Sequence, residues 1–128
     1  MAVLIMRFQA PMQSWGTQSR FTDRDTGIEP SKSGVIGLLC ASMGIDRNEN
    51  IDHLAALKMA VRADREGIVK YDFHTAMNVI KASGSPNNNA VISKRYFLAD
   101  AVFLVGIESD DIALLEKINH SLKNPIWP

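Results

Sequence analysis

The order of strand-like and helix-like segments constrains the fold of this 128-residue chain more than any other feature of its sequence. Alternating or continuous apolar runs predict four strands, at residues 3–8, 59–65, 68–79 and 101–107. Apolar residues at helical spacing predict two helices, at residues 31–44 and 109–122. This order matches the split βαβ, ferredoxin-like arrangement βαββαβ, except that a hairpin finger is present and the last strand is missing. We therefore predict an α+β fold of this type, as a single domain over residues 1–128.

The ends of the two helices are marked by residues that commonly cap helices. Ser31 is the expected N-cap of the first helix, and Gly44 is expected to end it. Ser109 and Asp110 are expected to cap the second helix. A short helical turn is predicted around residues 53–57.

The strand segments also carry predictions about their partners. Residues 3–8 are apolar on both faces, which favours a central position in a sheet. Residues 59–65 and 68–79 are expected to pair with each other as a hairpin, because the sequence DREG at residues 64–67 suits a turn. Residues 81–96 are rich in Gly, Ser, Pro and Asn, which predicts an exposed, mobile finger or loop.

Composition is that of an ordinary globular protein and excludes few functions. The chain has 14 basic and 14 acidic residues, so the net charge does not point to nucleic acid. Cys40 is the only cysteine, which suits a reducing compartment. The apolar start of the chain is too short for a signal peptide or a membrane span, so we expect a cytoplasmic protein without a membrane partner.

No motif for a metal or a cofactor is present. Cys40 and the three scattered histidines lack the spacing of metal ligands. Walker, dinucleotide-binding and nucleophile-elbow motifs are absent as well. The sequence therefore predicts neither a metal site nor a cofactor.

His74 is the one residue that suggests catalysis. It lies in a predicted strand with Lys70 and Asp72 on the same face, and Lys94 and Tyr96 follow the finger. A histidine with a lysine or a tyrosine can activate a 2′-hydroxyl and cleave RNA without a metal. This gives the hypothesis of a metal-independent endoribonuclease that uses His74 with Lys94 or Tyr96. The alternative is a half-exposed strand histidine without a catalytic role.

The segment SKRY, residues 93–96, combines two cations with a tyrosine at the base of the finger. Arg95 suits contact with a phosphate and Tyr96 suits stacking on a base, as in proteins that bind single-stranded RNA. The alternative is an ordinary strand edge.

The segment MQSWG, residues 12–16, places a tryptophan among hydrogen-bonding groups after the first strand. In one interpretation, Trp15 packs under the first helix as part of the core. In the other, Trp15 is a platform, and Gln13, Ser14 and the backbone near Gly16 bind an incoming chain. The residues themselves leave both interpretations open.

Four stretches resemble one protein family: PMQSWG, the R-x-T-G of residues 24–27, PSKSGVIGLLCASMGI at residues 30–45, and SKRYFLADAVF at residues 93–103. They resemble the CasD-like family, the Cas-five-type subunits of Cascade, the type I-E CRISPR surveillance complex. The resemblance implies a ferredoxin-like (RRM-like) domain with a β-hairpin thumb at about residues 77–93. It also implies a non-catalytic role in antiviral defence: binding the repeat-derived 5′ handle of CRISPR RNA and contacting the CasC and CasA subunits. Type I-C relatives cleave repeat RNA, which keeps the nuclease hypothesis open.

Carried over by residue, the resemblance gives a set of RNA-binding positions in the MQSWG loop, the start of the first helix and the base of the thumb. They are Gln13, Trp15, Gly16, Arg20, Lys32, Ser33, Lys94 and Arg95. Free backbone amides at a helix start are suited to phosphate.

The family continues beyond the segment LKNP, whereas this sequence stops at Pro128. We therefore expect a chain that is shortened at its C-terminus. An unpaired sheet edge and a partly uncovered second helix would then favour self-association.

Overall fold

The computed structural model describes residues 1–18 and 23–128, so that the predicted RNA-binding residue Arg20 lies outside the described residues. The elements within these ranges, in chain order, are β1 (Ala2–Gln9), β2 (Met12–Gln13), β3 (Asp23–Arg24), α1 (Lys32–Met43), α2 (Asp52–Ala55), β4 (Lys58–Arg65), β5 (Ile68–Ala76), β6 (Val91–Ala99), β7 (Val102–Ser109) and α3 (Ile112–Lys123). The two predicted helices and the strands near residues 3–8, 59–65 and 101–107 are therefore confirmed.

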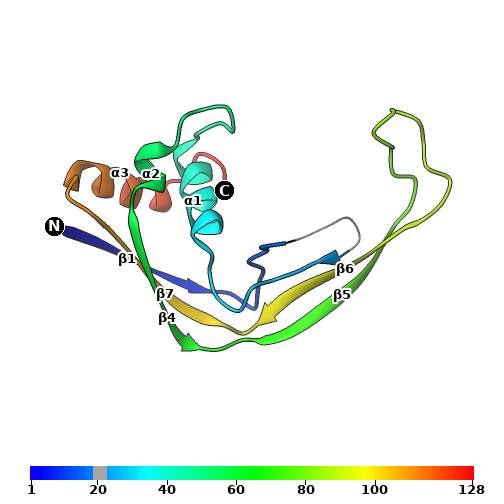
Figure 1. Ribbon diagram of the computed structural model, residues 1–128, viewed down its shortest axis with the longest axis horizontal. Helices are drawn as coiled ribbons and strands as arrows, with labels where there is room; N and C mark the ends of the chain where they lie inside the picture. Colours follow the sequence, from blue (N-terminus) through cyan, green and yellow to red (C-terminus); the bar gives the residue numbers. More distant parts are fainter. Residues whose placement is uncertain (19–22) are drawn as a thin grey trace.

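The core lies between a three-stranded antiparallel sheet and the helices (Figure 1). The strand order is β1-β7-β4, so β7, which contains the predicted strand at residues 101–107, is central. Side chains on one face of this sheet, such as Val105 and Ile107, are fully buried against helical residues such as Leu39 and Ile118. This arrangement, with the third main strand between the first two, is the ferredoxin-like α+β fold that the sequence predicts.

β1 does not take the central position that its apolar pattern predicts. Among the described residues it pairs with β7 alone and lies at the edge of the sheet. Met6 faces the helices and is buried, whereas Val3 and Ile5 face away from them and are 53% and 62% exposed. Burial within the described chain therefore does not explain why the face of β1 that carries Val3 and Ile5 is apolar. The predicted self-association stays a prediction.

The predicted hairpin between residues 59–65 and 68–79 is wrong. β4 pairs with β7, and β5 pairs with β6. The register runs on from one pair to the next, with Arg65 opposite Val102 and Ile68 opposite Ala99. The four strands therefore form one long two-stranded ladder that bends in the middle (Figure 1).

The bend has a local cause in both strands. A β-bulge interrupts β4 between Ala63 and Arg65, and bulges increase the local bend and twist of a strand. On the other strand Asp100 has a left-handed backbone, with φ of 59°. Gly67 lies so close to the opposite strand that a Cβ there would be 2.9 Å from the Cβ atoms of Leu98 and Ala101. Because Gly67 has no side chain, the two strands can approach each other closely at this point. The strand can therefore bend and continue, and it does not turn back on itself as a tight hairpin.

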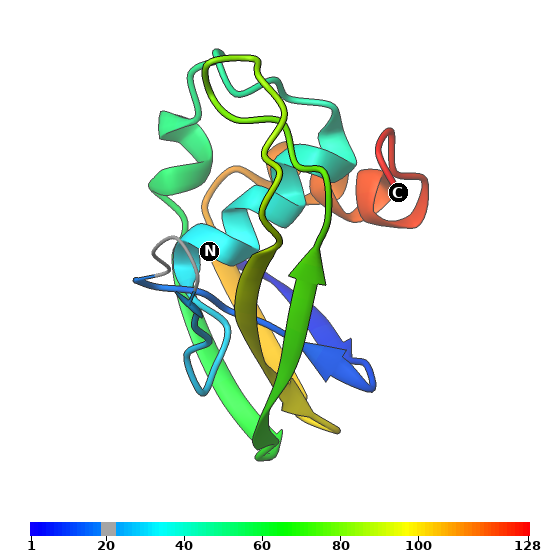
Figure 2. The ribbon, with the colours of Figure 1, turned by 90° about the vertical axis from the view of Figure 1, so that its right-hand side faces the viewer.

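Beyond the bend, the β5–β6 part of the ladder extends away from the helices (Figure 1). We call this part, residues 68–99, the arm. Figure 2 shows the arm in front of the helices. β6 is its central strand: β5 lies along one edge, while β2 and β3 lie along the other. The loop of residues 77–90 is almost wholly exposed, as the Gly/Asn-rich sequence predicts. Residues 91–96, predicted as part of that loop, instead belong to β6, because β5 gives them a pairing partner.

The helix ends follow the predicted capping chemistry with one correction. The Ser31 hydroxyl accepts a hydrogen bond from the Gly34 N–H at 3.2 Å, and Gly44 ends α1 in a left-handed conformation. The N-cap of α3 is Asp111, whose carboxylate accepts from the Leu114 N–H at 3.0 Å.

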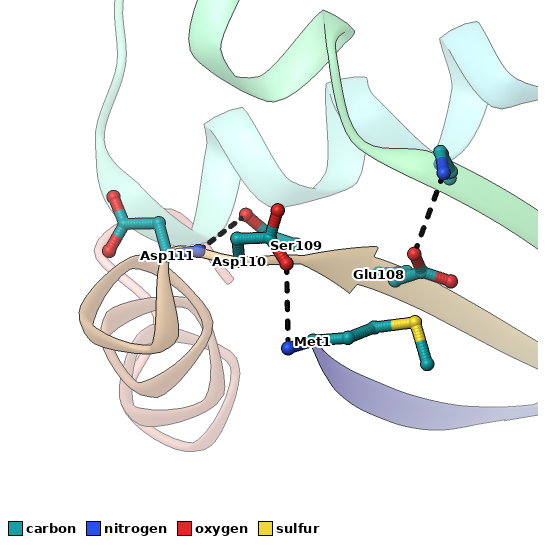
Figure 3. Close-up of polar contacts among 6 residues, drawn as sticks. Met1, Glu108, Ser109, Asp110 and Asp111 are labelled. Atoms are coloured by element: carbon teal, nitrogen blue, oxygen red, sulfur yellow. Dashed lines mark hydrogen bonds and ion pairs between the residues drawn. The ribbon is translucent and has the colours of Figure 1, made fainter.

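Ser109 and Asp110, the predicted caps of α3, make other contacts. Figure 3 shows the Ser109 hydroxyl accepting from the Asp111 N–H and the Asp110 carboxylate beside the Met1 ammonium group. The distances are 3.0 Å and 3.4 Å. The neighbouring pair of Lys58 and Glu108 joins β4 to β7 at 3.6 Å.

Within residues 1–18 and 23–128, no helix is long and apolar enough to cross a membrane. In the same part of the chain, His, Cys, Asp and Glu side chains do not gather into a group that could hold a metal ion.

Candidate nucleic-acid interface

The register of the arm sorts its side chains onto two faces. Opposed residues in an antiparallel pair share a face, and successive residues of a strand alternate. The face that continues the helix-covered side of the core sheet, through buried Leu98, is the inner face. The inner face carries Val69, Tyr71, Phe73, Ile92, Lys94 and Tyr96. The outer face carries Lys70, Asp72, His74, Ser93, Arg95 and Phe97.

The inner face is an aromatic surface with one cation. The rings of Tyr71 and Tyr96 lie 5.7 Å apart, and the Lys94 ammonium lies 5.6 Å from the centre of the Tyr71 ring. Phe73 continues the row and is 57% exposed. Exposed aromatic rings beside a cation can stack on bases or pack against a partner protein.

An open cavity of about 660 Å³ opens mainly on the outer face, although Gln13, Ser14 and Tyr96 also line it, and we call it the outer cavity. It lies along β6, where β2 and β3 leave a short gap between them. Ser14 sits in this gap and its hydroxyl donates a 3.0 Å hydrogen bond to the carbonyl of Tyr96. The other lining residues are Met12, Arg24, Asp72, Arg95 and Phe97.

Two arginines meet in this cavity because of an unusual strand pairing. β3 runs parallel to β6 and places Arg24 directly beside Arg95. Adjacent strands are about 4.8 Å apart, so two positive charges are held close together. Neither guanidinium has a hydrogen bond or an ion pair within the described part of the chain. Two unpaired guanidinium groups on one surface are suited to binding an anion such as phosphate, whose geometry matches the guanidinium fork.

The MQSWG loop is largely committed to holding the fold. The Gln13 amide donates to the carbonyls of Phe8 and Ala101 at 3.3 Å and 2.9 Å, and its oxygen accepts from the Trp15 indole at 3.2 Å. The Trp15 ring stacks on Phe8 with centroids 5.5 Å apart. It also lies against α1, where a Cβ on Gly34 would be 2.7 Å from the ring.

The structure therefore confirms the interpretation in which Trp15 packs under the first helix. Gly16 is exposed. RNA binding by Gln13, Trp15 and Gly16 stays a prediction.

Lys32 and Ser33 lie in the exposed first turn of α1. They line a separate cavity of about 380 Å³ between α1 and α2, together with apolar side chains such as Ile36 and Ile51. The structure does not bring them to the cavity of Arg24 and Arg95, and their role in RNA binding stays a prediction.

The residues of the nuclease hypothesis are not brought together. His74 is paired with Ser93 on the outer face, whereas Lys94 and Tyr96 lie on the inner face. Strand alternation turns neighbouring side chains to opposite sides of a sheet, and the sequence alone could not place these three relative to one another. For the same reason Arg95 and Tyr96, expected to act together on RNA, project from opposite faces.

Several residues of the two faces were not predicted as site residues from the sequence, among them Arg24 and Asp72 on the outer face and Tyr71 and Phe73 on the inner face. The alternation of residues 68–76 already places Tyr71 and Phe73 on one face. The sequence does not show that the helices leave this face uncovered, because this depends on the tertiary structure. Arg24 belongs to a family-like motif, but its neighbour Arg95 is known only from the β3–β6 pairing.

Together these features define a ferredoxin-like domain with a projecting β-arm and a basic cavity at the base of that arm. The family model described as CRISPR-associated protein (Cas_Cas5) matches residues 3–128. The chain therefore belongs to the Cas5 family of CRISPR-associated proteins, which confirms the resemblance seen in its motifs.

Individual relatives agree with this assignment. "CRISPR system Cascade subunit CasD" of Escherichia coli strain K12 is 32% identical over 81% of this chain and 52% of the relative. A solved "CRISPR RNA-guided surveillance complex" contains a chain that is 35% identical, with a TM-score of 0.90 over 98% of this chain and 55% of that one. A "Crystal structure of Cas protein" is 47% identical, with a TM-score of 0.76 over 99% of this chain and 54% of that one. This chain spans about half the length of these relatives.

Proposed function

We propose that this chain is a non-catalytic RNA-binding part of a Cascade-type CRISPR surveillance complex, where it holds the repeat-derived 5′ handle of CRISPR RNA. The observation that carries the proposal is the unpaired Arg24–Arg95 pair in the outer cavity. Family membership and the name of the Escherichia coli relative support it. We expect the complex to work in the cytoplasm.

The charge distribution is suited to a subunit that binds RNA within an assembly. The chain has no net charge, so attraction to RNA has to come from local clusters of cations. Arg24 and Arg95 form such a cluster on the outer face, and Lys94 supplies a further cation on the inner face.

We assign the exposed apolar side chains of the arm to contact with the neighbouring subunits, CasC and CasA. Tyr71, Phe73 and Ile92 are 57%, 57% and 48% exposed on one face. A contiguous exposed apolar surface of this kind is typical of a protein interface.

The proposal is tested by measuring the affinity of the full chain for a labelled CRISPR repeat RNA in EDTA, with and without CasC. We expect Arg24→Ala and Arg95→Ala each to weaken binding about tenfold, because each removes a phosphate contact. The slope of log affinity against log salt should fall by about 0.7 per lost contact on a single strand. Arg47→Ala, in the exposed loop after α1, is the matched control and should leave the affinity unchanged.

Two results would contradict the proposal. Shortened RNA in EDTA would make the chain a nuclease, and His74→Ala would then show whether His74 is the base. Equal affinity of the wild type and both arginine variants would make the arm a protein-interaction module, with the RNA held by partner subunits.

A further inference from the structure

We propose that the outer cavity holds one guanine base of the bound RNA and that the Asp72 carboxylate recognises it. This inference rests on the proposed function and adds base selectivity to it. Phosphate binding by Arg24 and Arg95 does not explain why the Asp72 carboxylate lies in the same cavity.

Asp72 is placed in the cavity by the β5–β6 register. It lies directly opposite Arg95, which in turn lies beside Arg24. Its side chain has no hydrogen bond or ion pair within residues 1–18 and 23–128, so it does not neutralise either arginine through a direct contact. A free carboxylate lowers the affinity of a site for phosphate by charge repulsion. A ligand that donates hydrogen bonds to Asp72 would turn this unfavourable charge into a contact.

Nucleobases differ in what they offer to a carboxylate. Guanine presents two adjacent donors on its Watson–Crick edge, N1–H and N2–H, and these match the two carboxylate oxygens. Adenine and cytosine each present an amino donor beside a ring-nitrogen acceptor, and uracil presents one N–H between two carbonyls. An ionised aspartate accepts hydrogen bonds but cannot donate them, so guanine is the base that it binds best.

The rest of the cavity is suited to an unstacked nucleotide. Met12, 59% exposed, and half-buried Phe97 provide apolar surface for the faces of a base. The cavity of about 660 Å³ is large enough for one nucleotide. Arg24 and Arg95 are then free to hold the phosphates on either side of the base.

The test uses the full chain and four labelled RNAs of about eight nucleotides, a length within the usual site size for single strands. One contains uridine only, and the others carry a single central G, A or C. Fluorescence anisotropy is expected to show that the wild type binds the G-containing RNA about tenfold more tightly than the uridine RNA. Asp72→Asn should reduce this ratio to within about twofold, with no loss of affinity for the uridine RNA.

Asp23→Asn is the matched control. It removes the same charge next to Arg24, but Asp23 is paired with Lys94 and so faces the inner side of the arm. The guanine preference should survive in this variant.

The outcomes separate the inference from the proposed function. If the wild type binds RNA without a guanine preference, or if Asp72→Asn keeps that preference, the inference is wrong and the proposed function stands. If Asp72→Asn weakens binding to all four RNAs equally, Asp72 only positions Arg95, and the inference is again wrong. If neither these RNAs nor the repeat RNA binds, both proposals are overturned.

Discussion

The two halves of the long ladder show how the same strand pattern can build a core or a binding surface. In the β4–β7 half, Val105 and Ile107 are fully buried under the helices, and Phe103 is fully buried next to Phe8 and Trp15. In the β5–β6 half, the equivalent inner-face side chains Tyr71 and Phe73 are each 57% exposed. The same two stretches of chain pair on both sides of the bend, apart from the register shift at the bulge in β4.

The difference follows from which part of the ladder the helices cover. α1 and α3 pack over the β1-β7-β4 sheet, and none of the described helices extends over the arm (Figure 1). Burial of apolar area stabilises the fold, whereas exposed aromatic surface remains available to a ligand or a partner. Stability should therefore depend on the first half and binding on the second.

The largest expected effect comes from truncating matched phenylalanines in the two halves. Phe103→Ala leaves a cavity at a fully buried site and should lower the free energy of unfolding by about 3–5 kcal/mol, measured by urea denaturation. Phe73→Ala removes an exposed ring and should change the free energy of unfolding by no more than about 0.5 kcal/mol. Similar losses in the two variants would contradict the division of the ladder into a core half and a binding half.

A smaller effect is expected at the bend that separates the halves. Gly67→Ala places a Cβ 2.9 Å from the Cβ atoms of Leu98 and Ala101, so a strand has to shift. We expect a loss of about 1–3 kcal/mol in thermal or urea unfolding.

Gly37→Ala is the control for this change, because no atom lies within 4 Å of its added Cβ. Gly37 lies inside α1, so its replacement should stabilise the chain by about 0.5–1 kcal/mol. A neutral Gly67→Ala would show that the bend does not depend on close packing.

The smallest expected effect concerns an exposed pair on β4, just before the bend. A hydrogen bond from the Arg62 guanidinium, 2.6 Å long, lowers the pKa of the Asp64 carboxyl. Because the folded pKa is depressed, the contribution of this pair is present above the ordinary pKa and is lost as the pH falls through the lower, folded value. Arg62→Ala should raise the pKa of Asp64 toward its ordinary value in an NMR titration, while Lys58→Ala should not change it.

Much of the fold could be predicted from local patterns. The helical spacing at residues 31–44 and the capping chemistry of Ser31 and Gly44 depend on near neighbours, and the structure confirms them. The wrong hairpin between residues 59–65 and 68–79 has a different origin. A turn-like sequence at residues 64–67 is compatible with a bend in a continuing strand, and only a distant segment decides between the two.

The candidate site was predicted less completely for the same reason. The sequence predicts that Lys94 and Arg95 bind RNA. That they point to opposite faces follows from strand alternation, and only once β6 is known to be a strand. Arg24 and Asp72 reach the same cavity from two other strands, β3 and β5, which are separated in the chain by α1, α2 and β4.

The sequence by itself determined the two main helices, the caps of the first helix and the family, because each depends on residue types at short or fixed spacing. Only the tertiary structure decided which strands pair, which half of the ladder the helices cover, and that Arg24, Asp72 and Arg95 share a cavity. These features depend on contacts between residues far apart in the chain. Local propensities do not encode such contacts, and burial against the helices and the β6 register select them.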